Sequence, residues 1–143
     1  MSFEQQLQRI FGHAATDARH EREDRERAPQ TVALHAPYVL RRYAEIAAAF
    51  AAQGMRSAQG AISARHDDRR GYHEVEYNAP DLHIRFGLVA DAAHLHWRTA
   101  SDERDCVIAA ETGRAEIDAA LLDAVSSFVG ARTQAAPDGV DRP

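Results

Sequence analysis

Acidic, basic and imidazole side chains alternate with apolar ones along three consecutive segments of this sequence. The alternating polar residues are Glu74, Glu76, His83, Arg85, His94, His96 and Arg98, and we call these seven residues the ladder. Carboxylates and imidazoles can exchange protons or bind metal ions, and guanidinium groups bind carboxylates. Alternation with a period of two is typical of antiparallel strands that have one face on the core and one face in water. We therefore expect the ladder to lie on one face of a sheet.

The turns between the strands decide which ladder residues meet. A turn centred on Ala90–Asp91 pairs Ile84 with Trp97 and places Arg85 beside His96. A shift of one residue would turn every apolar side chain of a strand towards water, so the apolar pattern itself supports this register.

The turn that contains Pro80 leaves two registers open. Glu76 meets His83 in one register and Arg85 in the other. Acids face bases in both, and such cross-strand pairs contribute roughly 0.2–1 kcal/mol each. A self-paired, solvated sheet face is the simplest interpretation of the ladder, because exposed ion pairs need no function to explain them.

A second interpretation is a binding face. A sheet without a covering layer offers a broad platform, on which arginine and histidine can recognise an acidic protein partner or a small anionic ligand. Histidine would make such binding sensitive to pH near 6.5. The candidate binding residues are Glu74, Glu76, His83, Arg85, His96 and Arg98.

A third interpretation is a metal site. A turn centred on Asp102–Glu103 would place His94 beside Glu111. His96 is two residues from His94, so the two imidazoles would project from the same side of a strand, about 6.5–7 Å apart. Two histidines and a carboxylate are a common ligand set for a divalent metal such as zinc or non-heme iron, and would make the chain a small metal-dependent or ligand-binding enzyme. The arginines of the ladder argue against a bound cation.

Composition narrows the classes of function. The net charge of −5 argues against nucleic acid or an anionic membrane as the main partner. The only cysteine, Cys106, allows no internal disulfide, and the first residues do not have the pattern of a signal peptide. All 17 basic residues are arginine, which together with the many alanines is typical of a GC-rich, bacterial-type genome. We therefore expect a soluble, cytoplasmic protein.

Helical periodicity marks the beginning of the chain. Apolar residues recur at helical spacing over 3–18, and the run 19–27 that follows is almost entirely charged. We expect a helix over 1–28 that stops at Pro29, with the charged run as a solvated extension. A docking arm for a second chain is the alternative interpretation of this helix.

A second helix is expected over 37–53. Pro37 fits its first turn, where a missing N–H costs nothing, and Gly54 is a typical stop. The stretch 30–36 before it is a loop or a short strand.

The rest of the chain predicts a sheet and a last helix. Connections between the strands are too short for parallel crossovers, so the sheet should be an antiparallel meander. The expected strands lie near 59–66, 72–78, 82–89, 93–100 and 105–111, and a helix over 114–129 with Gly130 as its stop follows.

These elements predict an α+β fold with two layers, in which the helices pack on one face of the meander. We expect one domain over 1–130 and a disordered tail over 131–143. The function that fits best is a non-catalytic binding protein of a regulatory or accessory kind. Homodimerisation through the first helix or a sheet edge is a further expectation.

Overall fold

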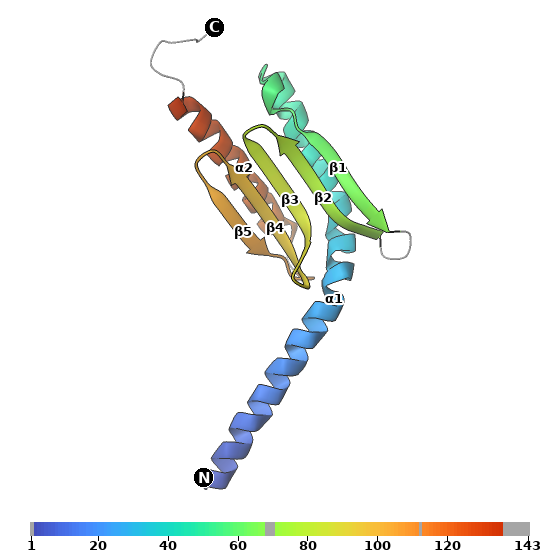
Figure 1. Cartoon of the computed structure of the whole chain (residues 1–143), viewed down its shortest axis with the longest axis vertical. Coiled ribbons are helices and arrows are strands. Elements are labelled where there is room, and N and C mark those ends of the chain that lie inside the picture. Colours follow the sequence, from blue (N-terminus) through green and yellow to red (C-terminus); the bar gives the residue numbers. More distant parts are fainter. Residues whose placement is uncertain (1, 68–70, 112, 136–143) are drawn as a thin grey trace.

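The chain folds into a five-stranded antiparallel sheet with helices on one of its faces. The computed structural model describes residues 2–67, 71–111 and 113–135. Strands that follow each other in sequence are neighbours in the sheet, and both helices lie on the same side of it (Figure 1). The elements are α1 (Phe3–Ala52), a 3-10 turn (Arg56–Ala58), β1 (Ala61–Asp67), β2 (Gly71–Ala79), β3 (Leu82–Val89), β4 (Ala92–Thr99), β5 (Glu103–Val107) and α2 (Arg114–Ala135). The predicted α+β meander is confirmed.

Both helical stretches expected in the N-terminal half are present, but they form one helix. α1 runs through Pro29 and Pro37, and the residues 30–36 between them are helical. Each proline removes one backbone hydrogen bond, and Figure 1 shows the helix bending where it reaches the sheet. Val32 and Ala36 are fully buried at helical spacing, and this burial offsets the lost hydrogen bonds. The expected stop at Pro29 and the expected loop or strand at 30–36 are therefore wrong.

The register between β3 and β4 agrees with the prediction. Ile84 faces Trp97 across the two strands. The turn residues Ala90 and Asp91 have φ angles of 49° and 66°, as a two-residue hairpin turn of type I′ requires. The apolar alternation and the turn chemistry thus select the same pairing.

The register between β4 and β5 differs from the prediction by four residues. His94 faces Val107, and β5 ends there, so Glu111 lies beyond the sheet. The predicted turn centre at residues 102 and 103 is wrong, because the turn is centred on residues 100 and 101.

A side-chain hydroxyl explains the position of this turn. Thr99 Oγ1 accepts the backbone N–H groups of Ser101 and Asp102, at 3.4 and 3.1 Å. It also lies 2.7 Å from the hydroxyl oxygen of Ser127 in α2. Threonine stabilises turns in this way, and here the hydroxyl pins the turn to the residues that follow it directly.

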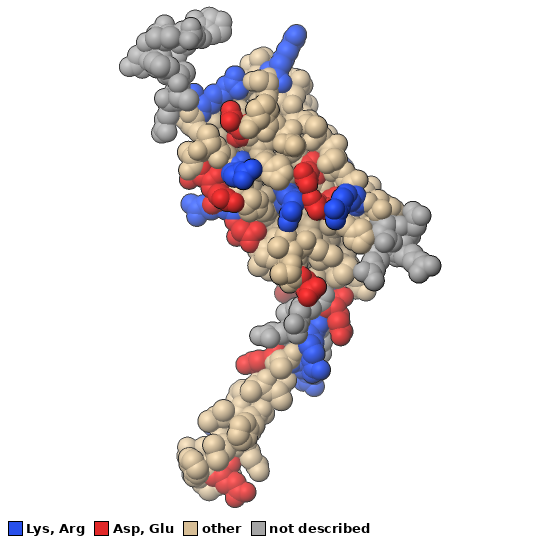
Figure 2. Space-filling model, viewed as in Figure 1, with Lys and Arg blue, Asp and Glu red and all other residues tan. Residues whose placement is uncertain are grey.

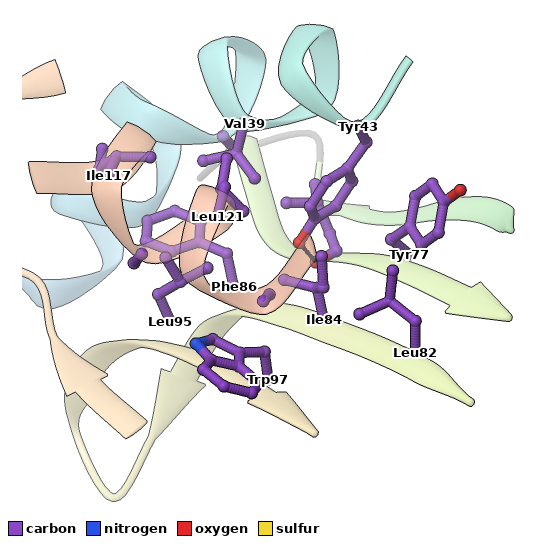
Figure 3. Packing of buried hydrophobic residues seen from close by; sticks show 14 of the residues in the cluster. Val39, Tyr43, Tyr77, Leu82, Ile84, Phe86, Leu95, Trp97, Ile117 and Leu121 are labelled. Carbon is purple, nitrogen blue, oxygen red and sulfur yellow. Dashed lines mark hydrogen bonds between the residues drawn. The ribbon is translucent and has the colours of Figure 1, made fainter. Parts of the chain in front are cut away.

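The core lies between the sheet and the two helices. Tyr43 of α1 is fully buried, and its hydroxyl donates a hydrogen bond to the carbonyl oxygen of Val75, at 3.1 Å. The phenol thereby satisfies its own polar atom while its ring fills the core. Figure 3 shows the residues that converge there, which are Val39 and Tyr43 of α1, Ile117 and Leu121 of α2, and Ile84, Phe86, Leu95 and Trp97 of the sheet.

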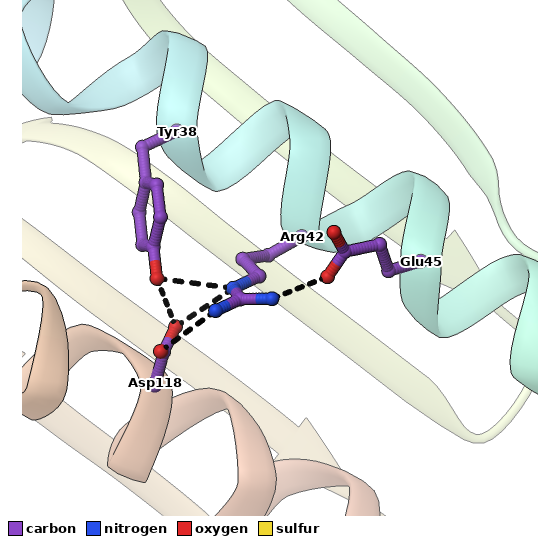
Figure 4. Close-up of polar contacts among 4 residues, drawn as sticks. All are labelled: Tyr38, Arg42, Glu45 and Asp118. Atoms are coloured by element: carbon purple, nitrogen blue, oxygen red, sulfur yellow. Dashed lines mark hydrogen bonds and ion pairs between the residues drawn. The ribbon is translucent and has the colours of Figure 1, made fainter.

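A polar cluster joins the two helices at the edge of this core (Figure 4). Asp118 of α2 accepts a hydrogen bond from the Tyr38 hydroxyl at 2.7 Å and two from the Arg42 guanidinium at 3.0 Å each. Arg42 also donates to Glu45, one turn further along α1. Partial burial acts to raise the pKa of Asp118, but the hydrogen bonds from Tyr38 and Arg42 outweigh it, and the pKa lies below its ordinary value.

The C-terminal helix is longer than expected. α2 continues through Gly130 to Ala135, so the predicted stop at Gly130 is wrong, and residues 131–135 are not a tail. Arg132 in this last part donates to the hydroxyl of Ser57, at 3.0 Å, which ties it to the 3-10 turn. The remaining residues of the expected tail, 136–143, lie outside the described residues.

We predict that Asp118→Asn lowers the free energy of unfolding by about 1–2 kcal/mol at pH 7, because it weakens the link between α1 and α2. The lowered pKa means that Asp118 stabilises the fold above the ordinary carboxyl pKa of about 4 and loses this effect as the pH falls through its folded value. The difference between wild type and variant should therefore shrink on acidification. Urea unfolding measured from pH 7 to pH 2 checks this.

The matched control is Glu45→Gln, whose side chain is 61% exposed and bonds Arg42 within one helix. It should cost less than about 0.5 kcal/mol. Equal losses from the two variants would show that the cluster does not link the helices.

Candidate binding face of the sheet

The seven ladder residues lie on the sheet face that the helices leave uncovered. Figure 2 shows acidic and basic side chains close together across the middle of this face. The ladder residues and their neighbours on this face form three rows across the strands. One row is Glu76, Arg85, His96 and Asp105, the next is Asn78, His83, Arg98 and Glu103, and the third is Arg65, Glu74, Gly87 and His94.

The pairing of β2 with β3 resolves the choice that Pro80 left open. Glu76 faces Arg85, and the alternative in which it faces His83 directly is excluded. His83 still reaches the same carboxylate diagonally, with its Nε2 at 3.2 Å from Glu76 Oε2. Glu76 is therefore shared between a guanidinium and an imidazole.

Glu74 and Glu76 form a carboxyl pair on β2. The hydrogen bond between them, together with partial burial, raises the pKa of Glu74. The same hydrogen bond lowers the pKa of Glu76, and the bond to His83 adds to this although burial opposes it. Arg85 limits the rise for Glu74 by its positive charge. Two carboxyl groups in contact favour sharing one proton, so the pair can take up or release a proton as a unit.

Glycine at position 87 makes room for this pair. Gly87 lies directly across from Glu74, and a Cβ atom there would come within 2.9 Å of the His73 carbonyl oxygen and 3.1 Å of Glu74 Cβ. A glycine inside a strand often marks such a close approach. The glycine within β3 is therefore a signal in the sequence from which the close packing at Glu74 could have been predicted.

The other two ladder histidines pair with acids of β5. His94 Nδ1 lies 2.7 Å from Asp105 Oδ2, and His96 Nε2 lies 2.7 Å from Glu103 Oε1. These two acids were absent from the predicted site, because the misplaced turn put other residues of β5 beside the histidines. The signal that could have found them is Thr99, whose hydroxyl favours a turn directly after it.

The predicted metal set does not come together. His94 and His96 share a face, but Glu111 lies four residues beyond the end of β5, so the pairing of His94 with Glu111 is wrong. Each histidine instead contacts its own carboxylate diagonally across the two strands, Asp105 for His94 and Glu103 for His96. Among the residues that the structure describes, no group of three or more histidine, cysteine, aspartate or glutamate side chains could hold a metal ion.

One corner of the ladder borders a hollow in the surface. The hollow has a volume of about 420 Å³ and lies where the β2–β3 turn meets the end of β4. Its lining includes His83, Arg98 and the acidic residue Asp81, with Asn78 beside them. Arg98 is exposed and makes no ion pair with another described residue, whereas His83 is held by Glu76. This corner presents a cation and an imidazole to the same small volume.

Comparison with protein-family models, with curated proteins and with solved structures found no match to this chain. Within the described part of the chain, no helix is both long enough and apolar enough to cross a membrane.

We predict that Glu74→Gln stabilises the protein at pH 7, by about 0.2–1 kcal/mol as is usual for charge pairs on sheets. A raised pKa means that Glu74 stabilises the fold while it is protonated and loses this effect as the pH rises through its folded pKa. Glutamine keeps the hydrogen bond to Glu76 without the charge. The gain should therefore vanish below about pH 4, where the wild-type carboxyl is protonated in both states. Thermal unfolding at pH 7 and pH 3.5 measures this.

The control variant is Glu103→Gln, which removes the same charge from the same face but weakens a pair with His96. It should bring no gain at pH 7. A loss of stability in Glu74→Gln at pH 7 would show that attraction to the neighbouring arginines outweighs the repulsion within the carboxyl pair.

Proposed function

We propose that this chain is a non-catalytic binding protein, of a regulatory or accessory kind, that uses the ladder face to recognise an acidic group on a protein partner. Support comes mainly from one observation. Arg98 is exposed at the edge of a hollow that His83 also lines, and its guanidinium makes no ion pair with another described residue, although Glu103 faces it across β4 and β5.

The residues of the face divide into those that bind and those that support. Arg98 and His83 are the groups that would meet a carboxylate, because they line the hollow. Glu76 orients His83 by its hydrogen bond. A guanidinium next to an oriented imidazole fits a carboxylate, which can accept hydrogen bonds from both.

Arg85 and His96 extend the face along the next row. Arg85 lies between acids of β2 and the imidazole of His96, so it contributes positive charge to the centre of the platform. Glu74 and Glu76 balance part of that charge, which leaves the corner with Arg98 and His83 as the place where an acidic group of a protein partner would bind. Net charge supports the same choice, because a chain of charge −5 does not attract nucleic acid or anionic membranes.

A cytoplasmic location is part of the proposal. It is supported by the single cysteine, Cys106, which leaves the fold without an internal disulfide. For the alternative of a metal-dependent or ligand-binding enzyme at His94, His96 and Glu111, no contact in the described structure offers support.

The test is binding of an acidic peptide to the purified chain. A hexaglutamate peptide, titrated by isothermal calorimetry at low salt, should bind the wild type. The double variant Arg85→Ala, Arg98→Ala should weaken this binding at least about tenfold, which corresponds to roughly 1.4 kcal/mol, while the free energy of unfolding stays nearly unchanged.

The matched control is the double variant Arg56→Ala, Arg104→Ala, which removes the same charge at exposed sites off the ladder face. It should change the affinity less than about twofold, an amount set by net charge alone. Equal losses in the two double variants, or no binding by the wild type, would contradict the proposal.

A further inference from the structure

The N-terminal part of α1 projects away from the rest of the molecule. We call residues 3–27 the arm, and Figure 1 shows it leaving the sheet as a free helix. Among the side chains that the structure describes, the first buried one in α1 is that of Ala28. The helix start is well defined, because Ser2 and Gln5 form a capping box in which each side chain bonds the other's backbone N–H.

The arm carries an apolar stripe with no contact partner among the described residues of the chain. Phe3 is 77% exposed, Ile10 is 60% exposed and Phe11 is 67% exposed, while Leu7 is 37% exposed. Helices in proteins owe most of their stability to packing of such a stripe, and exposed apolar stripes of this kind mark interaction sites. The exposed stripe therefore predicts that another surface packs against the arm.

We propose that the partner is a second copy of this chain, whose arm packs antiparallel against the first over residues 3–18. In this arrangement Phe3 meets Ala18 of the other copy, Leu7 meets Ala14, and Ile10 meets Phe11. The inference concerns a surface separate from the ladder face and does not rest on the proposed binding of an acidic partner.

The sizes of the side chains favour the antiparallel direction. The large residues Phe3 and Leu7 occupy the first half of the stripe, and the small residues Ala14 and Ala18 occupy the second half. An antiparallel pair places large against small along its whole length, which lets two helices approach closely. A parallel pair would place Phe3 against its own copy and leave a gap between the alanines.

The charges of the arm do not oppose the antiparallel direction. Glu4 and Asp17 fall at the same level of the pair, but at 100° per residue they lie on opposite flanks of the stripe, so the two acids do not meet. Arg19 lies about 130° from the centre of the stripe and points away from the other copy, so the charges neither favour nor oppose this pairing.

The length of the stripe matches the overlap. Beyond Ala18 the sequence becomes almost entirely charged over 19–27, and in this pairing residues 21–27 lie past the first residue of the other copy. From Ala18 to Ala28 the helix rises about 15 Å, which keeps each sheet clear of the other arm.

A membrane surface fits the arm less well than a second copy. Amphipathic helices that lie on membranes carry a basic polar face. The part of the arm over 3–19 has two arginines, Arg9 and Arg19, balanced by Glu4 and Asp17. Phe3 and Phe11 together present roughly 300 Å² of aromatic surface per chain, or roughly 600 Å² for two chains, which is below the roughly 1,200–2,000 Å² of stable complexes, so the dimer should be weak and its population should depend on concentration.

The first test is the mass of the full chain in solution. Sedimentation equilibrium should show the mass rising from that of the 15.8 kDa monomer towards twice that value with concentration. The double variant Ile10→Ser, Phe11→Ser should stay monomeric at concentrations at least about tenfold higher. Circular dichroism at low concentration reports whether the body remains folded.

The matched control is Gly12→Ser, Thr16→Ser, which changes the opposite side of the arm, where a Cβ atom at Gly12 meets nothing within 4 Å. It should dimerise like the wild type. A wild type that stays monomeric throughout, or that binds neutral phosphatidylcholine vesicles through the arm instead, would overturn the proposal.

The second test measures direction. A spin label on Arg22→Cys, in a Cys106→Ala background, should give a distance of about 35 Å between the two copies, because the labelled positions are about 23 residues apart along an antiparallel pair. A parallel pair would bring the two labelled backbones to about 10 Å, the usual distance between packed helices, and would overturn the proposed direction.

Discussion

Burial of one face of the sheet against α1 governs the other features of this molecule. Val39 and Tyr43 of the helix pack on Phe86 and its neighbours in the sheet, and Tyr43 also bonds the backbone of β2 through its hydroxyl. Burial of this kind is the largest favourable term in folding. It holds α1 helical across two prolines, and it places both helices on one side of the sheet. Both helices cover the apolar face, so the charged face stays exposed to water.

The turns of the sheet decide which charged side chains of the ladder face form pairs. Its histidines pair with acids of neighbouring strands, and the register of β5 decides which acids these are. The hydroxyl of Thr99 sets that register by accepting two backbone N–H groups in the turn. A turn centred two residues later would have brought Glu111 to His94. The position of one threonine therefore decides whether the histidines pair with acids of β5 or one of them meets Glu111.

The arm has the opposite character from the body. Its stripe has the spacing of a packed helix, but no part of the described chain covers it. The body buries most of its large apolar residues and shows water a mixed set of charges, while the arm exposes aromatic rings. Two separate surfaces thus remain available to other molecules, one polar with a hollow at Arg98, and one apolar on a helix.

The pattern of residues alone was enough to predict the α+β class, the meander and the face on which the ladder lies, because alternation of period two dictates which side chains share a face. It was also enough for the register of β3 with β4, where apolar pattern and turn agree. Contacts between distant parts of the chain were needed to show that α1 continues through Pro29 and α2 past Gly130, because burial and such contacts outweigh local helix stops. The partners of His94 and His96 also came from the folded chain, because their register depends on a turn whose hydrogen bonds, to Thr99, do not appear in a pattern of apolar residues.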